Sequence, residues 1–266
     1  MISIPLFKRN MFSCCKIGII FLAILMMYNS VIIYMFDPDL ADMLNGYQEA
    51  LPEMMAAVGM TGACKTLIQF VHTYLYGFIM LIIPLVFVVI ITNKLVMKYI
   101  DNGSMVCLLS TPNSRSTIIM TQMLSIILSI LFLISATAAL SYLCAEMMFP
   151  GDLDLSKYMQ LNISCFLFAF AMGGIAFFAA CIFNQSKGYF VLGAGLPMIF
   201  YLIQMMANMG GDLENLKYGT IFTLFPGEQI ISSKSGVFRN DLILGGIGLL
   251  LYIIGAIHFT KKDLPL

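Results

Sequence analysis

The sequence predicts an all-α membrane protein, a single transmembrane domain over residues 1–266 with six membrane-spanning helices. Sixty per cent of the residues are hydrophobic and only 11% are charged, whereas soluble domains carry about 25% charged residues. A soluble chain of this length could not enclose so much apolar surface in one core. The apolar stretches are continuous rather than alternating, which favours helices over a barrel because a helix satisfies its own backbone groups in lipid.

The charged residues divide the chain into six apolar stretches. Each is long enough to cross the hydrocarbon core, which takes roughly 20 helical residues. No Asp, Glu, Lys or Arg lies within any of them, and intramembrane charges usually mark proton or ion pathways. This absence argues against a proton-coupled antiporter. We expect spans at about residues 17–36, 67–92, 117–143, 159–183, 189–209 and 242–260.

The distribution of Lys and Arg predicts the orientation, because basic residues concentrate in cytoplasmic loops. With the N-terminus in the cytoplasm, twelve of the 14 acidic residues fall outside. We therefore expect a multi-pass protein of the cell membrane with both termini cytoplasmic. Nine of the 14 basic residues then fall inside: Lys8, Arg9, Lys16, Lys94, Lys98, Arg115, Lys187, Lys261 and Lys262.

The first 16 residues lead into a retained anchor helix. The apolar run after Lys16 is longer than the about 7–15 residues of a signal peptide and lacks a small-residue cleavage site. Before it, residues 2–15 form either an interfacial "elbow" helix, with bases near anionic lipid, or an ordinary basic flank.

Two outer segments are longer than simple turns. Residues 37–65 carry apolar residues at helical spacing and predict short helices lying on the membrane. Before the sixth span, residues 218–231 form an apolar patch that is too short to cross, which predicts a re-entrant or interfacial segment.

Several kinds of site are disfavoured. The seven Cys include no C-x-x-C pair and the two His are isolated, so no metal site is predicted. A net charge of zero gives no electrostatic reason to bind nucleic acid. Cys64 and Cys144 are both expected near the outer face, but sequence cannot establish whether they are bonded. Residues 62–66 lack the spacing of a P-loop, so ATP chemistry would need another polypeptide.

The most informative feature is a polar island at residues 101–115, between two spans and on the predicted cytoplasmic side. Asp101 or Asn102 could cap a short helix. Pro112 disfavours continuing it, and Ser114 could cap the next helix. Met105, Leu108 and Leu109 fall on one face of the short helix. Such a helix is unstable alone, so it must dock either on this chain's own helix ends or on a partner.

Other residues leave two interpretations open. Pro84 and Pro197 predict kinks that are either hinges or static packing features. Glycines near residues 173–174 and 245–248 allow close helix contact, within the chain or in a dimer. Asn29 could bond a neighbouring helix. His72 lies near the outer end of its span, where it could instead be a solvated interfacial residue. The polar residues best placed to line a substrate route are Gln69, His72, Tyr74 and Gln204.

The polar island resembles the loop between the second and third helices of ABC-2 type transporter permeases. Those carry an acidic residue, then Gly-Ser or Gly-Thr, then a Leu-Leu-Ser-Thr-Pro-x-x-Arg run. The basic N-terminal segment resembles the family's elbow helix, residues 224–231 the stretch before its last helix, and residues 259–266 its closing signature. Asp101 stands where many relatives have Glu, and Thr260 where many have a basic or another polar residue. The resemblance covers the whole chain, and its specificity lies in the joint spacing.

The resemblance implies a permease subunit of an ATP-driven transporter that exports a peptide, drug or lipid-like substrate. A separate P-loop ATPase subunit would hold ATP and Mg, and this chain would bind no cofactor itself. A second permease subunit, identical or different, would complete the membrane part within the lipid. The island would couple to the ATPase through Asp101, Gly103, Leu108, Leu109, Pro112 and Arg115, with Met105 on the apolar face.

A non-transporting membrane sensor or assembly partner, binding a peptide on its outer segments, is the alternative. An intramembrane enzyme is disfavoured, because the spans carry no acid pair or His–acid pair.

Overall fold

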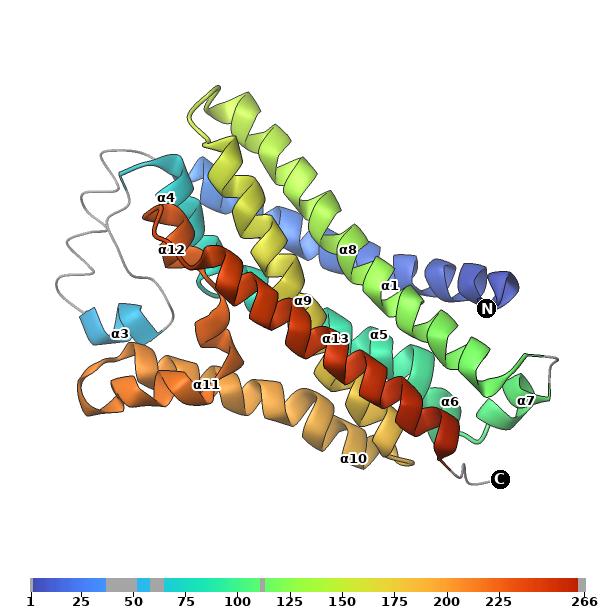
Figure 1. Cartoon of the computed structure of the whole chain (residues 1–266). Coiled ribbons are helices and arrows are strands. Elements are labelled where there is room, and N and C mark those ends of the chain that lie inside the picture. Colours follow the sequence, from blue (N-terminus) through green and yellow to red (C-terminus); the bar gives the residue numbers. More distant parts are fainter. Residues whose placement is uncertain (1, 37–51, 58–64, 111–112, 263–266) are drawn as a thin grey trace.

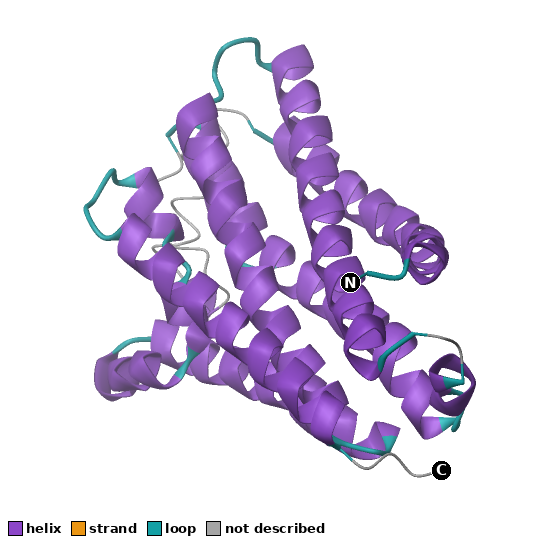
Figure 2. Ribbon diagram, turned by 45° about the vertical axis from the view of Figure 1, so that its right-hand side comes forward, coloured by secondary structure: helices purple, strands orange, loops and turns teal. Residues whose placement is uncertain are grey.

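A computed structural model describes residues 2–36, 52–57, 65–110 and 113–262 of the chain. Within these ranges the regular structure is helical and there is no strand, as Figure 2 shows. Six helices are long and apolar enough to cross a membrane, which confirms the predicted number of spans. Their bounds are Ile4–Tyr34, Ile79–Asp101, Arg115–Met148, Leu155–Ile182, Ser186–Asn208 and Val237–Lys261.

The first helix, α1 (Ile4–Tyr34), includes both the predicted elbow and the predicted first span. This differs from the expectation of a separate interfacial helix. No proline follows Pro5 within it, and the buried Asn10 holds its N-terminal part against α8 (Arg115–Met148) by donating to Ser125 Oγ at 3.3 Å. Further along, Ser141 of α8 donates to Asn29 Oδ1 at 2.7 Å, which confirms the predicted role of Asn29.

The second span, Ile79–Asp101, comprises three consecutive helical segments, and two shorter segments precede it. The uninterrupted stretch begins at Ile79 rather than near residue 67, because the backbone breaks at Phe78. It also continues past Lys94, which the sequence placed at its boundary, and the Lys94 amine reaches back to the carbonyl of Ser13 in α1 at 3.4 Å. The segments are α4 (Leu67–Val71), the π-helix η1 (His72–Tyr76), α5 (Ile79–Thr92), the π-helix η2 (Asn93–Met97) and α6 (Lys98–Asp101).

Both prolines of the spans have a local structural account. Pro84 lies inside α5 and has no N–H to give to the carbonyl of Met80 one turn earlier. The thiol of Cys165 donates to that carbonyl at 3.2 Å, so the freed group is satisfied. Pro197 lies in the first turn of α11 (Leu196–Asn208), directly after the π-helix η3 (Val191–Gly195). The Cys165 bond supports a static packing role for Pro84 rather than a hinge.

The centre of the bundle is α9 (Leu155–Ile182). In its apolar stretch 72% of the residues are buried, against 17% for Ser186–Asn208, which comprises α10 (Ser186–Phe190), η3 and α11. A close crossing joins α9 to α13 (Val237–Lys261). A Cβ on Gly174 would lie 3.0 Å from the carbonyl oxygen of Gly248. Gly174 and Gly248 therefore serve packing within the chain.

The outer segments are short helices. Of the surface helices predicted for residues 37–65, the structure describes α3 (Pro52–Ala57), and the rest lies outside the described residues. Before α13 come the 3-10 helices η4 (Gly211–Gly219) and η5 (Ile221–Leu224) and then α12 (Gly227–Ile231). The ring of Phe222 packs on Phe168 at 4.8 Å and on Tyr201 at 5.5 Å between centroids. This segment is folded against the bundle.

The bundle has two distinct ends (Figure 1). One carries α7 (Met105–Leu109), the start of α10 and the end of α13, and we call it the coupling end. The other carries α3, α4, α12 and the turn between α8 and α9, and we call it the opposite end. Arg115, Lys187 and Lys261 lie on elements of the coupling end, which the positive-inside pattern predicts to be cytoplasmic.

Candidate functional site

The turn before α7 depends on a glycine. Gly103 has a φ of +66°, in the left-handed region where a side chain is strained. The helix N-cap is Ser104, so the prediction of Asp101 or Asn102 as the cap is wrong. Asp101 instead ends α6, and Asn102 is the C-cap of that helix. The glycine thus lets the chain leave α6 and start α7 without a side-chain cap.

Asp101 ties this turn to the start of α10. Its Oδ2 accepts from the hydroxyl of Ser186 at 2.7 Å, and its Oδ1 accepts from the Ser186 backbone N–H at 3.2 Å. A carboxylate beside the first N–H groups of a helix interacts favourably with the helix dipole. The side chain therefore anchors the entrance to α7 on a different part of the bundle.

The exit from the α7 loop is anchored at the C-terminus. Ser114 caps α8 as predicted, with its hydroxyl accepting from the Thr117 N–H at 3.1 Å. Arg115, the first residue of α8, donates through Nη1 to the backbone carbonyl of Lys262 at 3.0 Å. Two residues that the sequence assigned to ATPase coupling, Asp101 and Arg115, thus hold the loop to its own chain.

Lys262 joins the same end of the bundle to α9. Its ammonium lies 3.1, 2.7 and 2.9 Å from three carbonyl oxygens at the end of that helix, and it has one hydrogen for each. These carbonyls lack partners within the helix, and a cation is favoured beside them. The bonded carbonyls belong to Cys181, Ile182 and Phe183.

The apolar face of α7 was expected to dock either on this chain or on a partner, and the structure decides between these alternatives for Met105 and Leu108. Met105 is only 2% exposed and Leu108 is partly buried against the same core, so both pack on this chain. The opposite side of α7 presents Val106, which is 39% exposed, and Cys107, which is exposed. Sequence reasoning did not select these two residues, because one apolar residue beside a cysteine has no periodic signal. The side chain of Leu109 and all of Pro112 lie outside the described residues.

A cavity of about 320 Å³ lies at the opposite end, between η1, α11, η5 and α12. It brings together His72 and Gln204, two of the four residues predicted to line a substrate route. The other two do not line it. Gln69 Oε1 accepts from the N–H of Thr66 at 3.2 Å in a capping box at the start of α4. The ring of Tyr74 packs on Phe70 at 4.7 Å.

His72 forms part of the floor of this cavity. It is 7% exposed, and its ring lies so close to Gly227 that a Cβ there would collide with Nε2. Burial lowers the pKa of His72 to about 4, and the nearby Glu228 carboxylate opposes that shift only in part. The imidazole is therefore neutral at physiological pH. The hydroxyl of Tyr201, another lining residue, is buried without a hydrogen-bond partner among the described residues.

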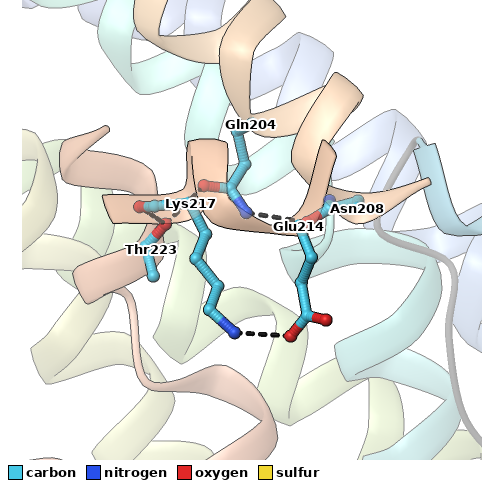
Figure 3. A network of polar contacts seen from close by, with 5 residues as sticks. All are labelled: Gln204, Asn208, Glu214, Lys217 and Thr223. Carbon is cyan, nitrogen blue, oxygen red and sulfur yellow. Dashed lines mark hydrogen bonds and ion pairs between the residues drawn. The ribbon is translucent and has the colours of Figure 1, made fainter. Parts of the chain in front are cut away.

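The wall formed by α11 is held by a polar network (Figure 3). Gln204 Nε2 donates to Asn208 Oδ1 at 2.7 Å. The hydroxyl of Thr223 lies 2.8 Å from Gln204 Oε1 and 2.6 Å from the carbonyl of Lys217, and with one hydrogen it donates to one of them at a time. Lys217 forms an ion pair with Glu214 at 2.6 Å. The network links η4 and η5 to α11.

The comparisons with known proteins give one result. A search of curated proteins found no match to the chain. A family model described as "ABC-2 family transporter protein" matches residues 15–264, which is nearly the full length. This agrees with the resemblance of the polar island and of the stretch before the last helix, both of which lie within the matched residues. The chain therefore belongs to the ABC-2 transporter family, as a membrane permease component.

Proposed function

We propose that this chain is the permease subunit of an ATP-driven exporter and that the exposed side of α7 contacts a separate ATPase subunit. Membership of the family implies an ABC ATPase partner. The observation that carries the contact is the way α7 is presented. Asp101 and Arg115 anchor the two sides of its loop, while Val106 and Cys107 remain exposed at the coupling end.

The anchors supply a route for motion. A push on α7 acts on α10 through the Asp101–Ser186 bonds and on the end of α13 through the Arg115–Lys262 bond. Lys262 passes it to α9 through three carbonyls. Such connected helices move as rigid bodies. ATP and Mg on the partner would shift the equilibrium between two arrangements through their different affinities for them.

The cargo side of the proposal rests on the cavity at the opposite end. Its lining combines aromatic rings with amides, a neutral imidazole and a carboxylate, a mixture that fits peptide, drug or lipid-like cargo. A second permease subunit, identical or different, would complete the membrane route. The N- and C-termini would lie in the cytoplasm.

The test of the ATPase contact uses Val106, the exposed apolar residue described on α7. The full chain is co-expressed with the ABC ATPase encoded nearest to its gene, and the recovery of ATPase with the purified chain is measured. We expect Val106→Asp to reduce recovery at least about tenfold, because a charge at the centre of an apolar contact is left unpaired. Val106→Leu keeps an apolar side chain and is the matched control.

Unchanged recovery with Val106→Asp would show that α7 is not the contact. Leu108 is a poorer choice for this test, since it packs partly against the chain's own core and its replacement also damages the fold. ATP-dependent cargo movement in vesicles then separates the exporter from a non-transporting sensor that binds a peptide at the opposite end. A sensor would bind the peptide without moving it.

A further inference from the structure

A second cavity, of about 300 Å³, lies where the N-terminal part of α1 meets η2, α6 and the turn before α7. Its lining includes three basic side chains and no acidic one. Arg9 comes from α1, Lys94 from η2 and Lys98 from α6. The nearest acid in sequence, Asp101, is bonded to Ser186 and does not line the cavity.

The three bases are not neutralised by the chain. None of them forms an ion pair with another residue in the part of the chain that the structure describes. Lys94 donates to the Ser13 carbonyl at 3.4 Å, which is long beside the about 2.7–2.9 Å of a strong charge-assisted bond. Like charges that share a cavity repel each other, and an anion among them removes that cost. The cavity therefore favours an anionic ligand.

The surroundings favour a lipid over a soluble anion. The same part of α1 exposes large apolar side chains, with Ile4 at 65% and Phe12 at 67% exposure. Exposed apolar groups beside basic ones are typical of a segment at the headgroup level of a bilayer. A soluble anion would need only the basic side chains and would not account for the exposed apolar ones.

We propose that this cavity binds the phosphate headgroup of an anionic membrane lipid. The bases would contact the phosphate, and polar groups of Ser13 and Asn102 would bond the remaining headgroup oxygens. Because Asn102 directly precedes the Gly103 turn, a bound headgroup would join α1 to the entrance of α7. Anionic lipid would thereby stabilise the arrangement of the coupling loop.

The experiment compares two pairs of substitutions in the purified full chain. Arg9→Gln with Lys98→Gln removes two bases that line the cavity. Lys8→Gln with Lys16→Gln removes two basic residues of α1 that do not line the cavity. Binding is measured by titration in detergent with short-chain phosphatidylglycerol, short-chain phosphatidylcholine, glycerol phosphate and inorganic phosphate. Thermal unfolding checks that all variants remain folded.

We expect the native chain and the Lys8/Lys16 variant to bind phosphatidylglycerol more tightly than the other three probes. The Arg9/Lys98 variant should bind it roughly 30-fold more weakly, since each basic residue near an anionic surface contributes about 1 kcal/mol. Equal losses in both double variants would mean diffuse attraction and would overturn the proposal. Equal affinity for phosphatidylglycerol and glycerol phosphate would assign the cavity to a soluble anion instead.

Discussion

The Asp101 carboxylate accepts a 2.7 Å hydrogen bond from the hydroxyl of Ser186, across 85 residues of sequence. The bond connects the turn before α7 to the start of the helical stretch that leads into α11. It is accompanied by a bond from the Ser186 N–H. This acidic side chain therefore fixes the entrance to α7 on the bundle, while Arg115 fixes the exit of the loop.

Replacing Asp101 with Ala should uncouple α7 from α10. We expect a loss of stability of about 1 kcal/mol, comparable with the loss of a helix-capping side chain. A larger loss is expected in ATP-driven transport. Asp101→Asn keeps an acceptor oxygen and should retain part of the stability and part of the transport activity. A double-mutant cycle with Ser186→Ala isolates the contact. Additive effects of the two single changes would show that the bond does not couple the segments.

Lys262 should contribute to stability through the end of α9. In Lys262→Met, three carbonyls lose their donor, and an unsatisfied buried group costs about 1–3 kcal/mol. We expect the low end of that range, because Lys262 is only half-buried and water can replace some of the bonds. Lys261→Met, at the exposed neighbouring position, is the matched control. Thermal unfolding in detergent measures both, and equal midpoints would contradict the assigned role.

The number of spans could be predicted from the sequence because charged residues rarely enter the hydrocarbon core. Their ends could not be predicted from charge alone. Lys94 lies inside a continuous helix. Its amine donates to the Ser13 carbonyl, a contact between residues far apart in sequence. Asp241, which bounds the sixth span in the sequence, lies inside α13. Asp241 accepts from Ser164 at 3.0 Å, so part of its charge is satisfied there.

The sequence predicted where the candidate site at residues 101–115 lies, but it did not predict most of the contacts that the site makes. The polar island and the Ser114 cap follow from local sequence, whereas the turn at Gly103 was not predicted. The face shared by Met105 and Leu108 was also predicted, but periodicity cannot show whether such a face packs on its own chain or on a partner. The structure turns Met105 inward and Val106 outward. Bonds such as that of Arg115 to Lys262 depend on tertiary proximity, which no local pattern contains.

His72 should make the protein sensitive to acid. Its pKa in the folded chain is about 4, below the ordinary value of 6.5, so the unfolded chain takes up a proton more readily. The stability associated with neutral His72 is present above about pH 6.5 and is lost as the pH falls towards 4. A shift of this size corresponds to roughly 3 kcal/mol.

His72→Gln should therefore lose less stability than the native chain between pH 7 and pH 4.5, in unfolding measured in detergent. The Glu228 carboxylate also faces His72 and opposes the lowering of its pKa. The pH response should therefore be measured for His72→Gln both alone and together with Glu228→Gln. His258→Gln removes the exposed second histidine and is the matched control. An identical pH response in the native and His72→Gln chains would contradict the assignment.

The α9–α13 crossing should not tolerate a methyl group at Gly174. A Cβ there would lie 3.0 Å from the Gly248 carbonyl oxygen and 3.2 Å from the Gly248 Cα, and both are backbone atoms that cannot turn aside. Gly174→Ala should therefore cost about 1–3 kcal/mol, as overpacking does in other cores. Gly246→Ala, on the facing helix, meets no atom within 4 Å. It should be neutral or stabilising by up to about 1 kcal/mol through helix propensity. Thermal unfolding of the two variants side by side tests the crossing, and a Gly174→Ala protein as stable as the native chain would show that these helices do not meet so closely.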